Sequence, residues 1–163
     1  MATLPRLIGG LSEIAHRYDA LICDVWGVLH DGHRAHRSAV EALRRFRGEL
    51  GPVVLLSNAP RPVDVLEEQF ARIGVPTDCY DAIVTSGVAT RDALELRANN
   101  RRLAILHIGP ERDRGVFEGL PIDCVDAPNA SVILGTRAEV QRGCVDRIRV
   151  ANFNVRTIRK TFR

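Results

Sequence analysis

The sequence lacks the features that define several classes of protein. Its 163 residues contain no run that approaches the ~18 consecutive apolar residues of a membrane span. The four cysteines are scattered and form no Cys-x-x-Cys pair, which argues against a zinc knuckle or a disulfide framework. The first residues also lack the long apolar segment of a secretory signal. We therefore expect a cytoplasmic protein without membrane association.

Lysine is nearly absent as well. Lys160 is the only lysine, so any role that requires a lysine side chain has a single candidate. The arginines are unevenly placed, because residues 137–163 carry a net charge of +6 while the rest of the chain carries −3. A basic segment can bind nucleic acid, but this one has only two aromatic residues between its charges. We expect a solvated or disordered tail at 138–163 rather than a nucleic-acid site.

The residues that are present indicate a globular α/β protein. Apolar residues make up 45% of the chain and charged residues 26%, which is enough to bury a core and to solvate the surface. Short apolar runs alternate with segments whose apolar residues recur at helical spacing, as Val40, Leu43 and Phe46 do. That alternation predicts a parallel sheet with right-handed crossovers. The expected strands are 20–25, 53–56, 82–84, 103–106 and 132–134, and the expected helices are 7–17, 40–50, 63–73, 88–97, 111–118 and 140–148.

Two of the expected strands end in residues that can do chemistry. Asp24 closes the first strand, and Ser57 with Asn58 follows the second. A carboxylate at the end of a buried strand is costly to desolvate unless a metal, hydrogen-bond donors or a reaction uses it. Ligands of doubly wound sheets bind at the carboxyl ends of the strands, so we expect Asp24 and Ser57 in one crevice. A carboxylate binds Mg²⁺ or attacks phosphorus, and hydroxyl and backbone N–H groups hold phosphoryl oxygens, so this pair predicts phosphoryl transfer.

The same two segments resemble motifs of the haloacid dehalogenase-like hydrolases. They are Asp24-Val25-Trp26-Gly27-Val28-Leu29-His30-Asp31-Gly32 and Leu55-Leu56-Ser57-Asn58-Ala59-Pro60-Arg61. The likeness covers about residues 15–136 and is greatest to subclass IIA, whose large cap is inserted after the second motif and which includes nucleotide and sugar phosphatases. It implies a Rossmann-like hydrolase core at 1–85, the start of an α/β cap at 86–137, and a tail outside the family pattern.

The resemblance also implies a role for each residue of the two motifs. Asp24 would be the nucleophile, would form an aspartyl-phosphate and would bind Mg²⁺. Ser57, with Asn58 beside it, would hold the transferring phosphoryl group together with the backbone at Gly27. The backbone carbonyl of Trp26 would be a second metal ligand. The implied reaction is the Mg²⁺-dependent hydrolysis of a small phosphorylated metabolite.

Two departures from the family pattern weaken the implied activity. Trp26 stands where the family usually has a second Asp, its general acid, and the loss of such an acid costs about 10²–10⁴ in rate. The missing general acid could be compensated by a good leaving group on the substrate, or by His30 or Asp31 acting as the acid. No acidic Gly-Asp motif follows Lys160, so Mg²⁺ lacks further carboxylates. We expect a weak or inactive phosphatase whose C-terminal end reads as a truncation or a change of reading frame.

Other interpretations stay open. The chain could be a non-catalytic remnant or a phosphate-binding module, and Asp24 could be a structural turn residue. His30, His33 and His36 could bind zinc, but without a clear fourth ligand solvated loop histidines are favoured. Trp26 either packs structurally or lines a substrate pocket. If half of the sheet is missing, edge strands and apolar surface are exposed.

Overall fold

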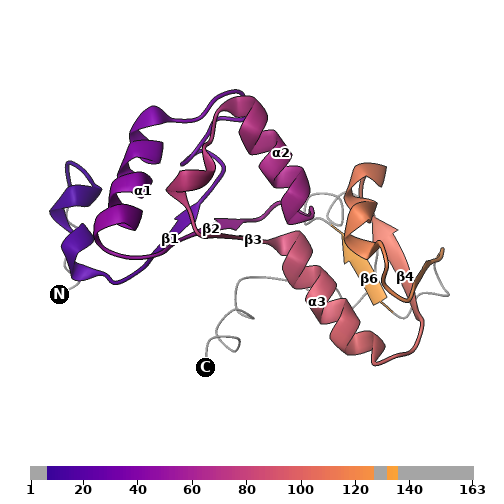
Figure 1. Ribbon diagram of the computed structural model, residues 1–163. Helices are drawn as coiled ribbons and strands as arrows, with labels where there is room; N and C mark the ends of the chain where they lie inside the picture. Colours follow the sequence, from indigo (N-terminus) through magenta and orange to yellow (C-terminus); the bar gives the residue numbers. More distant parts are fainter. Residues whose placement is uncertain (1–6, 127–131, 136–163) are drawn as a thin grey trace, which may run out of the picture. The chain divides into compact units, whose positions relative to one another are not determined.

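The computed structural model describes residues 7–126 and 132–135. Within them the backbone gathers into two compact units. The first unit combines the residues up to Asn58 with Val63–Thr85, and the second combines Ala59–Pro62 with the residues from Ser86 onward. Each unit contains a parallel three-stranded sheet (Figure 1). The expected α/β class with parallel strands is therefore confirmed.

The first unit has the strand order β1-β2-β3. Its elements are β1 (Leu21–Asp24), α1 (Arg37–Glu49), β2 (Val53–Ser57), α2 (Val63–Ile73) and β3 (Ala82–Thr85). The strands and helices expected at 53–56, 82–84, 40–50 and 63–73 are confirmed to within a few residues. Right-handed crossovers between strands in this order all return over the same side, so both helices belong to one face of the sheet.

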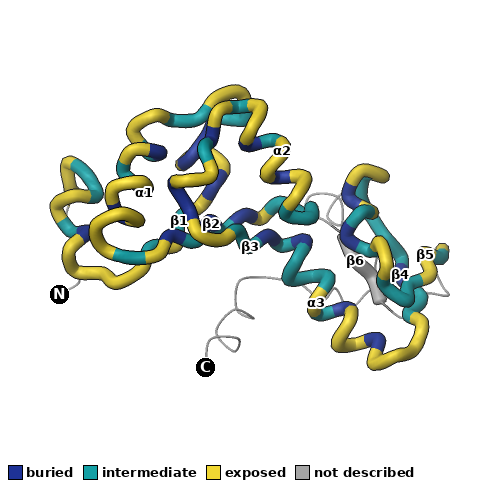
Figure 2. The backbone as a smooth tube through the Cα atoms, viewed as in Figure 1, coloured by how far each residue is buried: buried dark blue, intermediate teal, exposed yellow. Residues whose placement is uncertain are grey.

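Helices α1 and α2 form because their apolar residues recur on one side. Helix α1 buries Val40, Leu43 and Phe46, and α2 buries Leu66 and Phe70. Along both helices, buried residues alternate with exposed ones (Figure 2). Burial of such side chains against the sheet is what stabilises short helices in proteins.

Ion pairs tie α1 to the segment before β3. Arg44 donates two hydrogen bonds to the Asp78 carboxylate, at 2.7 and 2.8 Å, and Arg47 donates one to Asp81 at 2.8 Å. The Arg44 guanidinium thereby lowers the pKa of Asp78. Asp78 lies in η3 (Thr77–Cys79), a 3₁₀ turn that the sequence pattern did not predict.

The second face of this sheet is poorly covered. The register pairs Ile22, Val54 and Ala82 in one row and Asp24, Leu56 and Val84 in the next. All six are exposed or half-buried, and Ile22 is 64% exposed. The expectation that β1 is a buried strand is therefore wrong. β1 is exposed because both crossover helices lie on the opposite face of the sheet. It is also an edge strand within the described residues.

The N-terminal segment also differs from the expectation of a helix at 7–17. It forms two 3₁₀ turns, η1 (Leu11–Glu13) and η2 (Ala15–Arg17). Of the residues in these two turns, which are all described, Ala15 alone is buried. With so little apolar surface buried, an α-helix here has no packing to offset its entropic cost.

The second unit restarts the α/β pattern. Its elements are α3 (Ser86–Ala98), β4 (Leu103–Ile108), η4 (Glu111–Phe117), β5 (Ile122–Cys124) and β6 (Val132–Gly135), with the strand order β5-β4-β6. Leu94 and Ile105 form the buried centre, against which Leu103, Phe117, Leu120 and Ile122 pack. The expected elements between 86 and 135 are confirmed, β5 was not predicted, and the helix expected at 140–148 lies outside the described residues.

Helix α3 packs closely on the loop Ala59–Pro62. A Cβ atom at Gly87 would lie 2.5 Å from the backbone oxygen of Arg61 and 2.6 Å from its backbone nitrogen. The Gly87 N–H donates a hydrogen bond of 3.2 Å to the Ala59 carbonyl. Only glycine permits this approach of helix and loop.

Candidate active site

Asp24 and Ser57 are the last residues of two neighbouring parallel strands. Leu56 is the register partner of Asp24, so Ser57 lies one position further along β2. Adjacent strands run about 4.8 Å apart, which brings both residues to the same edge of the sheet. Asp24 is exposed, and one of its carboxylate oxygens, Oδ1, accepts a hydrogen bond of 2.7 Å from the Val25 N–H. Ser57 is buried.

The exposure of Asp24 corrects the expectation of a costly buried carboxylate. Asp24 shares the uncovered sheet face with Ile22, so water reaches it in this structure. An exposed carboxylate needs no partner to offset its desolvation. The argument for function at Asp24 therefore depends on its place at the strand end and on its neighbours.

The chain folds back tightly after Asp24. The Val25 carbonyl accepts hydrogen bonds from the N–H groups of Val28, Leu29 and His30, at 3.4, 2.9 and 3.4 Å. Gly27 has a φ of +78°, a left-handed conformation that favours glycine. Its N–H donates a hydrogen bond of 2.8 Å to the His30 carbonyl. The Gly27 N–H thus has an acceptor within the turn, and the left-handed conformation of Gly27 shapes this turn.

His30 joins this turn to the core. The ring is 3% exposed, lies edge-on to Phe70 with centroids 5.9 Å apart, and accepts a 2.9 Å hydrogen bond at Nδ1 from the Gly32 N–H. Burial lowers the pKa of His30, although Asp31 opposes that shift. The expectation of a solvated loop histidine is therefore wrong for His30.

Trp26 lies on the outer side of the same turn. Its indole is 62% exposed, and its centroid lies 5.5 Å from that of His30 in an edge-to-face arrangement. A Cβ atom at Gly32 would lie 2.5 Å from the indole carbon Cη2, so the six-membered part of the ring rests on the Gly32 backbone. Trp26 is thus packed on two sides and open to solvent on the rest.

The two residues considered as substitute general acids are poorly suited to that role. Asp31 accepts hydrogen bonds of 2.9 Å from the N–H groups of His33 and Arg34, and these bonds lower the pKa of Asp31. A carboxyl group with a lowered pKa is ionised at neutral pH and has no proton to donate. The pKa of His30 is lowered too, so that ring is neutral at the same pH.

The described residues give no support to the zinc alternative. His33 is exposed and His36 is half-buried, while His30 faces the core. Among residues 7–126 and 132–135, no group of three or more His, Cys, Asp or Glu side chains is placed to hold a metal ion.

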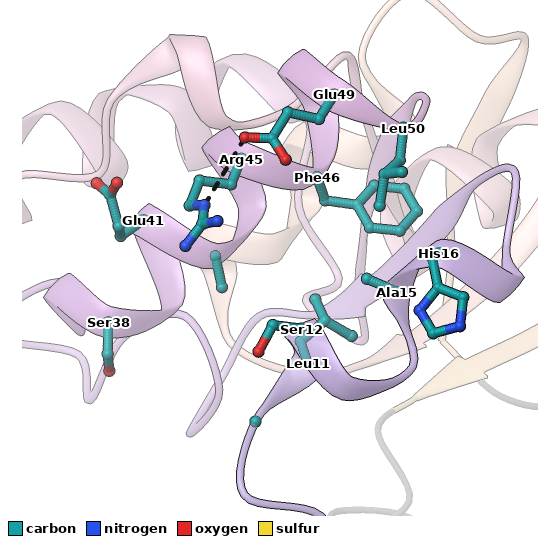
Figure 3. A pocket seen from close by; sticks show the side chains of 12 residues that line it. Leu11, Ser12, Ala15, His16, Ser38, Glu41, Arg45, Phe46, Glu49 and Leu50 are labelled. Atoms are coloured by element: carbon teal, nitrogen blue, oxygen red, sulfur yellow. Dashed lines mark ion pairs between the residues drawn. The ribbon is translucent and has the colours of Figure 1, made fainter.

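A groove of about 500 Å³ lies elsewhere in the first unit, between the N-terminal turns and α1. Leu11, Ala15 and Phe46 line it together with polar groups, and an Arg45–Glu49 ion pair of 3.8 Å lies at its edge (Figure 3). Neither Asp24 nor the residues around Ser57 line this groove, so it is separate from the candidate site.

The comparisons with known proteins agree with the motif pattern. A family model described as haloacid dehalogenase-like hydrolase matches residues 21–122. The chain belongs to the haloacid dehalogenase-like hydrolases. A search of curated protein sequences found no match. Within the described residues, no helix is long and apolar enough to cross a membrane.

Solved structures give relatives of this hydrolase chain. A haloacid dehalogenase-like hydrolase from Brucella suis 1330 is 36% identical, with a TM-score of 0.70 over 80% of this chain and 48% of that one. NagD from E. coli K-12 is 27% identical, with a TM-score of 0.54 over 74% and 47% of the two chains. Glycerol phosphate phosphatase from Mycobacterium tuberculosis, in complex with calcium, is 20% identical, with a TM-score of 0.52 over 75% and 36%, and shares the fold alone. The chain spans about half or less of the length of these structures.

Proposed function

We propose that this chain is a phosphoester hydrolase in which Asp24 attacks the phosphorus of a small phosphorylated metabolite. The observation that carries the proposal is the place of Asp24, exposed at the carboxyl end of β1 and next to the end of β2 at Ser57. Ligands of such sheets bind at this edge. Membership of the hydrolase family supports the reaction class.

The proposed reaction has two displacements. A carboxylate oxygen of Asp24 attacks phosphorus, and the bond from phosphorus to the ester oxygen breaks. A water molecule then attacks the phosphorus of the aspartyl-phosphate, which releases phosphate and restores the carboxylate. We assign the phosphoryl oxygens to Ser57 and Asn58, and we give Gly27 the role of holding the turn that follows Asp24.

Asp24 and the Trp26 carbonyl provide a donor set that suits Mg²⁺. Within the described residues no hydrogen bond ends on the Trp26 carbonyl, and the Asp24 carboxylate is exposed. Mg²⁺ prefers oxygen ligands and commonly binds one or two carboxylates, substrate phosphate and several waters. When bound, the ion would neutralise charge on the phosphoryl oxygens. We propose that the ester's own oxygens complete this site.

Three further parts of the proposal concern the whole protein. We propose that residues 1–85 belong to the hydrolase core, that 86–137 begin an α/β cap, and that the protein acts in the cytoplasm. The second compact unit supports a cap, because it has its own core around Leu94 and Ile105.

The test compares Asp24→Asn with the unchanged chain in hydrolysis of an aryl phosphate with Mg²⁺. We expect the variant to lose at least about 100-fold in rate, because an amide cannot act as the nucleophile. Asp19→Asn is the matched control, since Asp19 is also exposed but precedes the same strand. Equal rates for the unchanged chain and Asp24→Asn would refute the proposal.

A second candidate, a phosphate-binding module without turnover, is favoured because, among the described residues of the turn after Asp24, His30 and Asp31 are poorly suited to act as a general acid. Trp26 has no proton to donate at neutral pH, and Asp31 is held ionised. Calorimetry with inorganic phosphate and Mg²⁺ separates the two. Binding that weakens in Asp24→Asn, with no hydrolysis by the unchanged chain, would select the binding module.

A further inference from the structure

The solvent-facing indole of Trp26 is the part of the site that the proposed reaction leaves unused. We propose that Trp26 is a specificity-determining residue that stacks on the leaving group and selects phosphate monoesters of planar aromatic alcohols. This inference rests on the proposed function of Asp24 and names the substrate class of that same site.

The first argument is position. Asp24 is exposed, Val25 is 2% exposed and Trp26 is 62% exposed. Consecutive Cα atoms lie about 3.8 Å apart, so the Cα atoms of Asp24 and Trp26 are within about 7.6 Å of each other. Both side chains are exposed while Val25 between them is buried, so the Trp26 indole and the Asp24 carboxylate both reach solvent beside the turn that follows β1. When the phosphorus of an ester lies at Asp24, its leaving group spans a distance similar to the separation of Asp24 and Trp26.

The second argument is rigidity. The indole rests on the Gly32 backbone and packs edge-on to His30, which itself packs on Phe70 in the core. The Gly32 N–H is in turn hydrogen-bonded to the His30 ring at 2.9 Å. A ring fixed in this way loses little conformational freedom when a flat molecule covers its open surface. Offset stacking of two aromatic rings is favourable beyond the area that it buries.

The third argument is the chemistry of the leaving group. When the bond from phosphorus to the ester oxygen breaks, that oxygen keeps the electron pair and leaves as an anion unless an acid protonates it. Trp26 supplies no proton, and the Asp31 carboxylate accepts two backbone N–H groups. A phenolic oxygen has a pKa of about 10, whereas water, which resembles an alkyl alcohol, has about 16. An aryl oxide therefore leaves without an acid and takes its proton later from solvent, while an alkoxide leaves far more slowly.

The experiment uses Trp26 as its own probe, because it is the only tryptophan in the chain. The Asp24→Asn chain, which we expect to bind esters more weakly than the unchanged chain and without turnover, is titrated in the presence of Mg²⁺ with phenyl phosphate, ethyl phosphate and inorganic phosphate. We expect phenyl phosphate to change the Trp26 emission and to bind about five- to tenfold more tightly than ethyl phosphate. Phenol without phosphate is the control for stacking alone.

Calorimetry with the same esters then compares Trp26→Leu and Trp26→Phe, each on the Asp24→Asn background. We expect Trp26→Leu to abolish the preference for phenyl phosphate and Trp26→Phe to keep part of it. In the chain with Asp24 intact, Trp26→Leu should raise KM for phenyl phosphate with little change in kcat. Thermal unfolding checks that both variants fold like the parent. If Trp26→Leu does not fold, the binding preference of Trp26→Phe is the test of the stacking role.

The outcomes separate this inference from the proposed function. Equal binding of phenyl and ethyl phosphate, or a preference that survives Trp26→Leu, overturns the stacking role while Asp24-dependent hydrolysis still stands. Emission of Trp26 that depends on protein concentration and not on ester means that a second copy covers the ring, and it also overturns the inference. If phenyl and ethyl phosphate bind equally and Asp24→Asn hydrolyses as fast as the unchanged chain, both proposals fall.

Discussion

At the scale of the residue, His30 connects the turn after Asp24 to the core. Its ring lies between Trp26 and Phe70, and its Nδ1 accepts the Gly32 N–H at 2.9 Å. Phe70 packs in turn on Tyr80, with centroids 6.1 Å apart. A row of aromatic rings thus runs from a buried helix residue to the surface beside Asp24. The geometry of the candidate site depends on this row as much as on the strand end.

His30 should make the free energy of unfolding depend on pH. Because burial lowers its pKa below the ordinary 6.5, the unfolded chain binds the proton more readily than the folded protein. Its contribution is complete above about pH 6.5 and declines as the pH falls below that value. We expect His30→Asn to remove this decline while costing about 1–3 kcal/mol through lost packing. The Asn side-chain oxygen can still accept the Gly32 N–H.

Urea unfolding at about pH 7.5 and about pH 5.5, on either side of the ordinary histidine value, measures this effect. His33→Asn is the matched control, because His33 is exposed and its replacement should leave the pH dependence unchanged. Asp31, whose pKa is lowered from the ordinary 3.8, affects the pH dependence of unfolding only at more acidic pH. An unchanged pH dependence in His30→Asn would rule out His30 as its source.

At the scale of the element, the start of α3 depends on a glycine. Gly87 lies so close to the Arg61 backbone that any Cβ must displace main-chain atoms, at 2.5 and 2.6 Å. We expect Gly87→Ala to destabilise the protein by about 1–3 kcal/mol, because backbone cannot yield as a flexible side chain does. Urea unfolding followed by circular dichroism is the measurement.

Gly48 in α1 provides the matched comparison. Nothing lies within 4 Å of a Cβ built there. Because alanine favours the helix over glycine, Gly48→Ala should stabilise the protein by up to about 1 kcal/mol. If both replacements changed the free energy of unfolding in the same direction, the close approach of backbone at Gly87 would not explain the effect of Gly87→Ala.

At the scale of the whole molecule, the sequence predicts periodic elements better than it predicts their surroundings. The spacing of Leu66 and Phe70 is sufficient to place α2, because one helical face needs only local information. Burial of β1 could not be predicted, since it depends on which face the crossovers cover. His30 was assigned to solvent because its loop is polar, whereas its partner Phe70 lies 40 residues away.

The candidate site shows the same division. The motifs place Asp24 and Ser57 at adjacent strand ends, and the register brings them to one edge. The hydrogen bond from the Gly27 N–H to the His30 carbonyl depends on the three-dimensional path of the turn, which spacing does not record. The packing of Trp26 on Gly32 is hidden from the sequence for the same reason.

The uncovered face of the first sheet should promote self-association. Ile22 is 64% exposed on an edge strand and lies in register with Val54 and Ala82, neither of which is buried. Apolar edge strands of this kind pair with other chains. We expect Ile22→Thr to reduce association in sedimentation at rising protein concentration, while changing the free energy of unfolding by less than about 1 kcal/mol, because the side chain is largely exposed already.

Leu55→Thr is the contrasting variant, since Leu55 is fully buried in the central strand. It should cost about 2–4 kcal/mol, because it leaves a small cavity and places a hydroxyl group in the core. Association that is equal in Ile22→Thr and the unchanged chain would show that this face is not where the molecules meet. A decrease in association in Ile22→Thr but not in Leu55→Thr would instead mean that the exposed apolar face, and not the stability of the core beneath it, controls self-association.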